Sequence, residues 1–227
     1  MKKTVFYQEA AYLLGMMILA IGTALMEAAN FGMSMVVAPA YLLHLKLSPV
    51  FPVFSFGMAE YVLQGVLIIV LMLAMRRARL FYLFSFVTAV IYGFMLDASL
   101  AAMAHVPVAG LAMRMVSYAA GLVICSLGVA LLFHTYIAPE AYELVVKEVS
   151  AKHGWPVSRV KTAYDCISCL IAVCMSFAFF GIGRFEGVKL GTILCALVNG
   201  TLIGRISAWL EAKFDFRDGL PMRRWFV

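Results

Sequence analysis

Two carboxylates fall inside apolar stretches of the sequence, where hydrocarbon side chains are expected. Glu60 lies eight residues after Pro52. Asp165 lies nine residues after Pro156. At about 1.5 Å per residue these positions are roughly 12 and 14 Å into their helices, near the centre of a bilayer about 30 Å thick. Because a charged group there costs at least about 2.5 kcal/mol, we expect the two carboxyl groups to face each other and to bind a proton or a cation.

Two further polar residues lie one helical turn from these carboxylates. Gln64 follows Glu60 by four residues, and Lys161 precedes Asp165 by four, so each pair shares one face of its helix. Lys161 either pairs with Asp165 as a structural ion pair or extends to the membrane surface and leaves the acid free. Both alternatives remain open. In either case the polar stripe faces protein or water rather than lipid.

The apolar run from Gly22 to Pro39 carries two more candidates, Glu27 and Asn30. In a continuous helix Glu27 would lie near the membrane surface, where it would have little function. If Gly32 breaks the helix, the freed backbone groups together with Glu27 and Asn30 would line a cavity, as in the discontinuous helices of transporters. The sequence favours neither alternative.

The composition of the chain requires a membrane. Of its 227 residues 64% are hydrophobic and 13% charged, which is more apolar material than a soluble core of this size can bury. Apolar stretches of bilayer length predict six spans. The first starts near Val5 and continues beyond Leu25, and the others lie at about 52–75, 80–97, 114–137, 157–180 and 189–210. The first stretch follows Lys2 and Lys3 as a signal peptide would, but it belongs to an internal repeat and we interpret it as a span. The fold class expected is an all-α integral membrane protein forming one domain over residues 1–227.

The basic residues predict the orientation. With the N-terminus inside the cell, all but four of the 18 lysines and arginines fall on the cytoplasmic side. The exceptions are Lys46, Arg114, Arg184 and Lys189. Both termini should therefore be cytoplasmic. The net charge of +6 is spread over the span ends rather than gathered on one face, so we expect no nucleic-acid partner.

An internal repeat relates the two halves of the chain, at about 7–100 and 112–210. Tyr12, Gly15, Ile18, Gly22, Ala24 and Leu25 recur at the same spacing as Tyr118, Gly121, Ile124, Gly128, Ala130 and Leu131. Tyr92 and Asn199 are equivalent near the ends of the third and sixth spans. Because each unit has three spans, the second must enter the membrane from the opposite side, which gives an inverted repeat of the kind found in secondary transporters, with the first and fourth spans as candidates for broken helices. A purely structural pseudo-dimer is the alternative.

His134 falls one position from the repeat equivalent of Glu27. It is a candidate for proton binding, although a lone histidine is more often a hydrogen-bonded packing residue.

Two segments outside the spans complete the chain. Residues 139–154 predict an amphipathic helix that lies on the cytoplasmic membrane surface or packs under the bundle, the alternative being a solvated connector. Residues 211–227 predict a cytoplasmic tail whose Trp225 and Phe226, beside Arg223 and Arg224, anchor it at the interface.

Other chemistries lack support in the sequence. Cys166 and Cys169 form a single CxxC inside a predicted span, with no second pair and no nearby histidine, so we interpret them as buried thiols without a metal. The chain has no phosphate-binding loop, no GxSxG and no HExxH motif. We therefore expect no enzyme, no catalytic residues, no metal and no cofactor.

Several blocks of the sequence resemble the YczE/YitT-like membrane proteins of bacteria. They are residues 31–39 (FGMSMVVAP), 60–65 (EYVLQG), 92–97 (YGFMLD), 160–165 (VKTAYD) and 191–200 (GTILCALVNG), which occur in the family's order from about Tyr12 to Gly204. The resemblance implies a multi-pass protein of the bacterial inner membrane in a group suspected of transport, with no agreed substrate. The loop 183–187 departs from the family pattern.

The sequence leads to one main functional hypothesis, a secondary transporter or exporter of a small organic solute that works by alternating access. Glu60 and Asp165 would form its central site, completed and lined by Lys161, Gln64, Glu27, Asn30, Tyr92 and Asn199. Because acids outnumber bases in the spans, the carried or coupled species is a proton or an organic cation. The alternatives are a non-transporting scaffold or accessory subunit and, third, a channel. Membrane lipid is the other expected partner, and a homodimer is left open.

Overall fold

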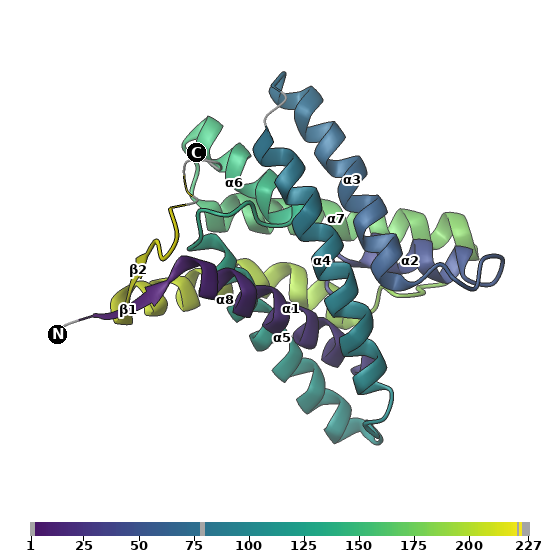
Figure 1. The fold of residues 1–227 in the computed structure, drawn as a ribbon. Helices are drawn as coiled ribbons and strands as arrows, with labels where there is room; N and C mark the ends of the chain where they lie inside the picture. Colours follow the sequence, from purple (N-terminus) through teal and green to yellow (C-terminus); the bar gives the residue numbers. More distant parts are fainter. Residues whose placement is uncertain (1–2, 78–79, 222, 224–227) are drawn as a thin grey trace.

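The protein is described here from a computed structural model that covers residues 3–77, 80–221 and 223 (Figure 1). Six long helices are apolar enough to cross a membrane, which confirms the predicted spans. They are α1 (Gln8–Ala29), α3 (Phe56–Met75), α4 (Leu80–Met103), α5 (Leu111–Phe133), α7 (Val157–Phe180) and α8 (Leu190–Lys213). Two shorter helices, α2 (Ala38–Leu47) and α6 (Ala141–His153), lie between α1 and α3 and between α5 and α7. The all-α fold class is confirmed.

The first and last elements that the structure describes lie at the same end of the helix bundle, which we call the terminal end (Figure 1). There the strand β1 (Thr4–Tyr7) pairs in parallel with β2 (Phe214–Arg217), a contact that apolar periodicity did not predict. The Glu9 carboxylate accepts hydrogen bonds from the Tyr136 hydroxyl at 2.6 Å and from the Leu220 amide at 2.9 Å, so the tail is fixed to the bundle. The predicted anchor residues Arg224, Trp225 and Phe226 lie outside the described residues.

Glycines bring α1 and α5 into close antiparallel contact. A Cβ added to Gly22 would lie 2.9 Å from the Gly121 carbonyl oxygen, and one added to Gly15 would lie 3.1 Å from the Gly128 oxygen. Gly15 and Gly121 are equivalent in the sequence repeat, as are Gly22 and Gly128. Exchanging the two halves therefore converts the Gly22–Gly121 contact into the Gly128–Gly15 contact. Reciprocal contacts of this kind are expected of two halves related by a two-fold axis perpendicular to both helices.

The other helix contacts follow the same pattern in both halves. Helix α1 packs against α4 as α5 packs against α8, and α3 packs against α4 as α7 packs against α8. The short helices correspond as well, because α2 contacts α3 and α7 while α6 contacts α7 and α3. Over the described residues each half therefore contains the three predicted spans and one additional short helix.

Each short helix follows a segment that runs back into the bundle. After α1 ends at Asn30, which adopts a left-handed conformation, Gly32 takes a φ of 103° and the chain passes along the first turns of α8, where Cys195 Sγ lies 4.0 Å from Ser34 Oγ. After α5, the carbonyl oxygens of Ala138 and Pro139 accept hydrogen bonds from side chains of α4. Thus α1 is continuous through Glu27, and the break follows the span instead of dividing it.

Candidate functional site

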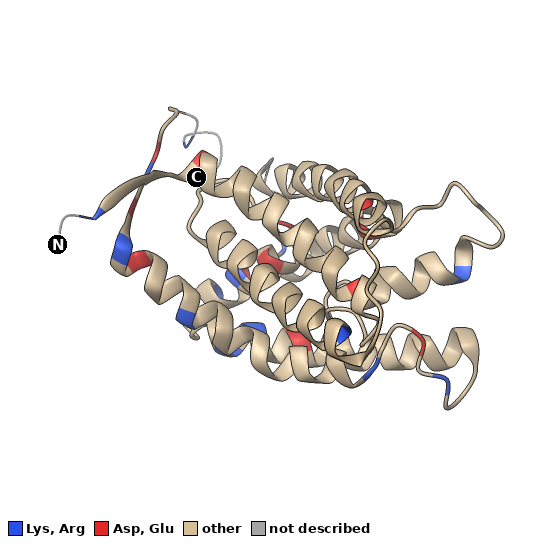
Figure 2. Ribbon diagram, turned by 90° about the horizontal axis from the view of Figure 1, so that it is seen from below, with Lys and Arg blue, Asp and Glu red and all other residues tan. Residues whose placement is uncertain are grey.

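The interior of the bundle contains charged residues as well as apolar ones (Figure 2). The largest group, which we call the acidic cluster, is made of Glu60, Glu140, Glu143, Lys161 and Asp165. None of these side chains is more than 2% exposed. They come from α3, from the N-cap and first turn of α6 and from α7, so tertiary packing gathers residues about 100 positions apart in the sequence.

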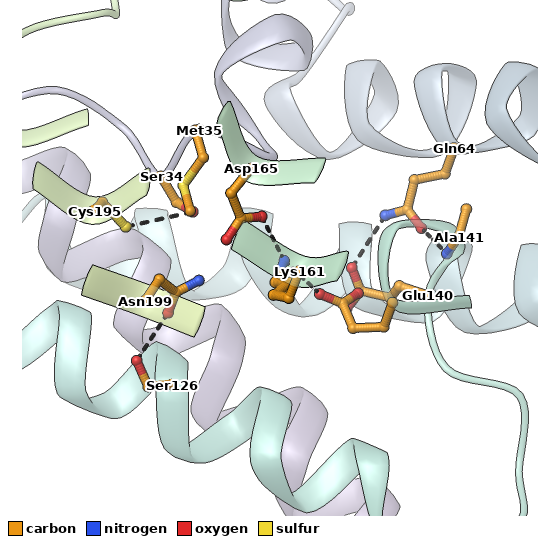
Figure 3. Close-up of polar contacts among 11 residues, drawn as sticks. Ser34, Met35, Gln64, Ser126, Glu140, Ala141, Lys161, Asp165, Cys195 and Asn199 are labelled. Atoms are coloured by element: carbon orange, nitrogen blue, oxygen red, sulfur yellow. Dashed lines mark hydrogen bonds and ion pairs between the residues drawn. The ribbon is translucent and has the colours of Figure 1, made fainter. Parts of the chain in front are cut away.

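Lys161 lies at the centre of the cluster on α7 (Figure 3). Its ammonium group is 2.9 Å from an Asp165 carboxylate oxygen, one helical turn further along the same face. It is also 3.5 Å from Glu143 of α6. Of the two alternatives left open by the sequence, the structure has the ion pair, and Lys161 does not extend to the surface.

Glu60 has a separate set of partners on α3 and α6. Its carboxylate accepts hydrogen bonds from the Tyr142 hydroxyl at 2.9 Å and from the Gln64 amide at 3.3 Å. Gln64 also donates to Glu140 at 3.2 Å and accepts from the Ala141 backbone amide at 3.0 Å. The amide of Gln64 therefore links the two carboxyl groups to the start of α6.

Glu60 and Asp165 do not pair with each other, so the expectation that they face one another is wrong. The physical reason is that α6 packs against both α3 and α7, with Tyr142 meeting Glu60 and Glu143 meeting Lys161. The alternative of a solvated connector for residues 139–154 is also wrong, because Ala141, Tyr142 and Leu144 are buried.

Glu140 and Glu143 are the functional candidates that the sequence did not indicate. In the sequence they read as acids in the first turn of a surface helix, where they favour the helix dipole. One signal was available: the α6 segment follows Ala138-Pro139, the repeat equivalent of Ala38-Pro39 inside the first apolar run. That correspondence would have placed the start of α6 inside the bundle.

The charges of the acidic cluster do not balance. Four carboxyl groups meet one ammonium group, and Glu60 Oε1, Glu140 Oε1 and Glu143 Oε2 have no hydrogen-bond partner among the described residues. Burial raises the pKa of Glu140 well above its ordinary value, and the nearby Glu143 and Glu60 carboxylates raise it further. The cluster is therefore suited to hold additional protons or a cation.

Asn199 and Tyr92 occupy different surroundings although they are equivalent in the repeat. Asn199 of α8 accepts a hydrogen bond from Ser126 at 2.9 Å, and its amide lies beside Asp165 (Figure 3). The Tyr92 hydroxyl of α4 instead meets Thr23 of α1 at 3.0 Å. Asn199 thus adjoins the acidic cluster, whereas Tyr92 fixes α4 to α1.

A cavity of about 370 Å³ opens at the terminal end of the bundle, between α5, α6, α7 and α8. Lys161 forms part of its wall, together with His134 and Glu211. His134 approaches Glu211 at 3.1 Å and the Ala130 carbonyl oxygen at 2.7 Å, so it is held by packing partners outside the acidic cluster. We call this the terminal cavity.

A second cavity, of about 400 Å³, opens at the opposite end and is lined by Glu27 with residues of α2, α3 and α4. We call it the Glu27 cavity. A smaller cavity of about 50 Å³ adjoins Glu27 and Asn30. The side-chain oxygen of Asn30 accepts a hydrogen bond from Lys189. Glu27 and Asn30 thus line cavities whose described linings contain no residue of the acidic cluster.

The cysteines and possible metal ligands of the described residues form no metal-binding group. Over those residues no group of three histidine, cysteine or carboxylate side chains could hold a metal ion. Cys166 and Cys169 are free thiols, and Cys166 is exposed on α7 rather than buried as the sequence suggested.

The fold and the site define an all-α, multi-pass membrane protein with an acidic cluster inside the bundle. Residues 6–208 match the model of a family of unknown function, DUF6198, and the chain belongs to that family. A search of the curated proteins and a search of the solved structures each found no match.

Proposed function

We propose that this protein is a secondary transporter or exporter of a small organic solute, working by alternating access with a proton or an organic cation as the coupled or carried species. One observation carries the proposal: the buried acidic cluster lies between two cavities that open at opposite ends of the bundle. A carrier needs a central site separated from each side by a thin layer of protein.

The layer on each side is about one helical turn thick. Lys161 lines the terminal cavity, and Asp165 is four residues further into α7. Phe56 lines the Glu27 cavity, and Glu60 is four residues further into α3 on the same face. One turn of helix is about 5.4 Å, so each acid is separated from the neighbouring cavity by a short distance along its own helix.

The remaining features of the proposal come from the sequence. The distribution of lysine and arginine supports cytoplasmic termini, which makes the terminal cavity the cytoplasmic one. The location in the bacterial inner membrane rests on the resemblance of the sequence blocks. The sequence blocks support a relation to the YczE/YitT-like proteins. We propose neither an enzyme nor a nucleic-acid-binding protein, and lipid and the solute are the partners.

Proton flux in liposomes tests the proposal. We expect an imposed proton gradient to drive solute movement, and protons to move with it, in liposomes that contain the protein. Asp165→Asn and Glu60→Gln should each reduce this protein-dependent proton flux at least about tenfold. Glu148→Gln is the matched control, because Glu148 accepts a hydrogen bond from Tyr82 and lines neither cavity. Flux equal to wild type in both cluster variants would refute the site.

A second candidate, a membrane scaffold or accessory subunit, is favoured by the partners of Glu60 and Lys161, because buried polar groups with such partners also hold helices together. If the protein is a scaffold, Asp165→Asn and Glu60→Gln should change its stability and should have no effect on flux. Liposomes without any protein-dependent flux, containing folded wild-type protein, would favour this candidate.

A further inference from the structure

The Glu27 cavity has an acidic group at an aromatic wall. Glu27 of α1 and Tyr41 of α2 line this cavity together, and the Tyr41 hydroxyl interacts with the carboxylate. Tyr41 and Phe56 pack edge to face with ring centroids 5.3 Å apart. The His44 ring stacks on Phe56 at 6.2 Å. Three rings and one carboxylate therefore surround the same space.

The basic residues near this wall are engaged elsewhere. Arg114 donates to the Ala29 carbonyl at 2.8 Å and to the Asn30 carbonyl at 3.0 Å, which caps the end of α1. Lys189 donates to the Asn30 carbonyl at 3.2 Å. His44 Nδ1 lies 2.9 Å from the Phe54 carbonyl oxygen, and because a carbonyl only accepts, that nitrogen carries the proton. Lys189 and Arg114 therefore neutralise the end of α1, while the lining of the Glu27 cavity contains no lysine or arginine.

The rest of the cavity is apolar. Leu100, Met103, Val106 and Val108 supply its other side, from the end of α4 and the link to α5. A volume of about 400 Å³ is at the lower end of the range for small-molecule sites. Its chemistry excludes anions, because Glu27 would repel them, and favours a compact ligand with one positive charge.

We infer that the Glu27 cavity binds a small organic ammonium ion, with Glu27 as its counter-ion and the rings of Tyr41, Phe56 and His44 around its substituents. Aromatic faces attract cations, and quaternary ammonium ions in particular bind in cages of this kind. A metal ion would instead require several oxygen ligands, which one carboxylate does not provide.

This inference deepens the proposed function and depends on it only for the identity of the cargo. Phe56 separates the Glu27 cavity from Glu60, which lies one turn deeper on α3. An ammonium ion bound in the Glu27 cavity would thus lie about one helical turn from the acidic cluster. Binding itself requires no transport and can be measured without a membrane gradient.

Choline and its neutral isostere 3,3-dimethylbutan-1-ol are matched probes, because they have the same shape and differ in charge. We expect titration calorimetry on the full chain in detergent to show choline bound at least about tenfold more tightly than the alcohol. Glu27→Gln should remove that preference. Tyr41→Leu should lower the affinity for choline, and Tyr41→Phe, which keeps the aromatic ring, should lower it less. The control Glu148→Gln should leave the affinity for choline unchanged.

Equal binding of the two probes by the wild-type protein, or an unchanged preference in Glu27→Gln, would overturn the inference. If Glu27→Gln does not fold, two other measurements test the inference. They are the comparison of choline with the alcohol in wild-type protein and the comparison of Tyr41→Leu with Tyr41→Phe. The two proposals fail separately. Proton-coupled flux without choline binding refutes the ammonium site alone, whereas choline binding without any flux refutes transport alone.

Discussion

The ammonium group of Lys161 forms an ion pair with an Asp165 carboxylate oxygen at 2.9 Å, and both side chains are buried. The pair lies on one face of α7 and is completed from α6 by Glu143. A buried ion pair stabilises a fold only when both partners are present, since each charge alone bears the full cost of leaving water. The interaction therefore ties the position of α6 to that of α7.

The first prediction concerns the coupling between these two residues. We expect Lys161→Met and Asp165→Asn each to lower the free energy of unfolding, by up to about 3–5 kcal/mol. Lys161→Met leaves the Asp165 and Glu143 carboxylates without their cation, and Asp165→Asn leaves Lys161 with the more distant Glu143 alone. The double variant should lose less than the sum of the two, with a coupling of about 1–3 kcal/mol. Denaturation in mixed micelles measures all three. Additive losses would show that the pair contributes nothing.

A second prediction tests the contact between α1 and α5. Gly22→Ala would place a Cβ 2.7 Å from the Cys125 backbone nitrogen, so the helices must separate, at a cost of about 1–3 kcal/mol. We expect a lower melting temperature in detergent. Gly204→Ala on α8 is the control, because its nearest neighbour would be 3.9 Å away. Equal melting temperatures in the two variants would contradict the close approach.

The orientation of the bundle gives a third prediction. Ala104 lies beyond α4 at the Glu27 cavity, and Ser158 lies in the first turn of α7 at the terminal cavity. With Cys166, Cys169 and Cys174 replaced by serine, we expect a membrane-impermeant maleimide to label Ala104→Cys in intact bacteria. Ser158→Cys should react only after the cells are permeabilised, because the proposed orientation places the terminal end in the cytoplasm. The reverse pattern would invert the proposed orientation.

A fourth prediction follows from Glu140, which precedes α6 outside the six spans. Burial and its acidic neighbours raise the pKa of its carboxyl above its value in the unfolded chain, so the folded protein binds a proton that the unfolded chain has released. This group's contribution to stability is therefore retained at low pH and lost as the pH rises from about 4.5 through the raised pKa.

We expect Glu140→Gln to flatten the fall in melting temperature between about pH 5 and pH 8, because the amide has no proton to lose. Glu148→Gln, whose partner is Tyr82, should keep the wild-type slope. A slope that is identical in wild type and Glu140→Gln would mean that the carboxyl group titrates alike in both states.

Much of the fold could be read from apolar length. The stretches at 157–180 and 189–210 correspond closely to α7 and α8 because a run of about twenty apolar residues has few alternatives in a bilayer. The third span was expected to end at Asp97, yet α4 continues to Met103. Asp97 is used inside the helix, where it accepts hydrogen bonds from Ser55 at 2.6 Å and from the Gly57 amide at 2.8 Å at the start of α3.

Part of the site was also accessible. Glu60, Gln64, Lys161 and Asp165 were identified because charged and amide groups within a span need a partner. Their partners were not. An amphipathic stripe such as that of residues 141–153 looks the same whether the helix lies on a membrane or enters the bundle, so the burial of Glu140 and Glu143 required the contacts of α6 with α3 and α7.

The sequence by itself determined that the chain has six apolar spans and that Glu60 and Asp165 lie deep within two of them, because transfer of side chains to lipid depends on local composition and length. Only the tertiary structure decided that α6 stands between Glu60 and Asp165, and that separate cavities approach the acidic cluster from the two ends. Those arrangements depend on how distant segments pack, which no local pattern of residues encodes.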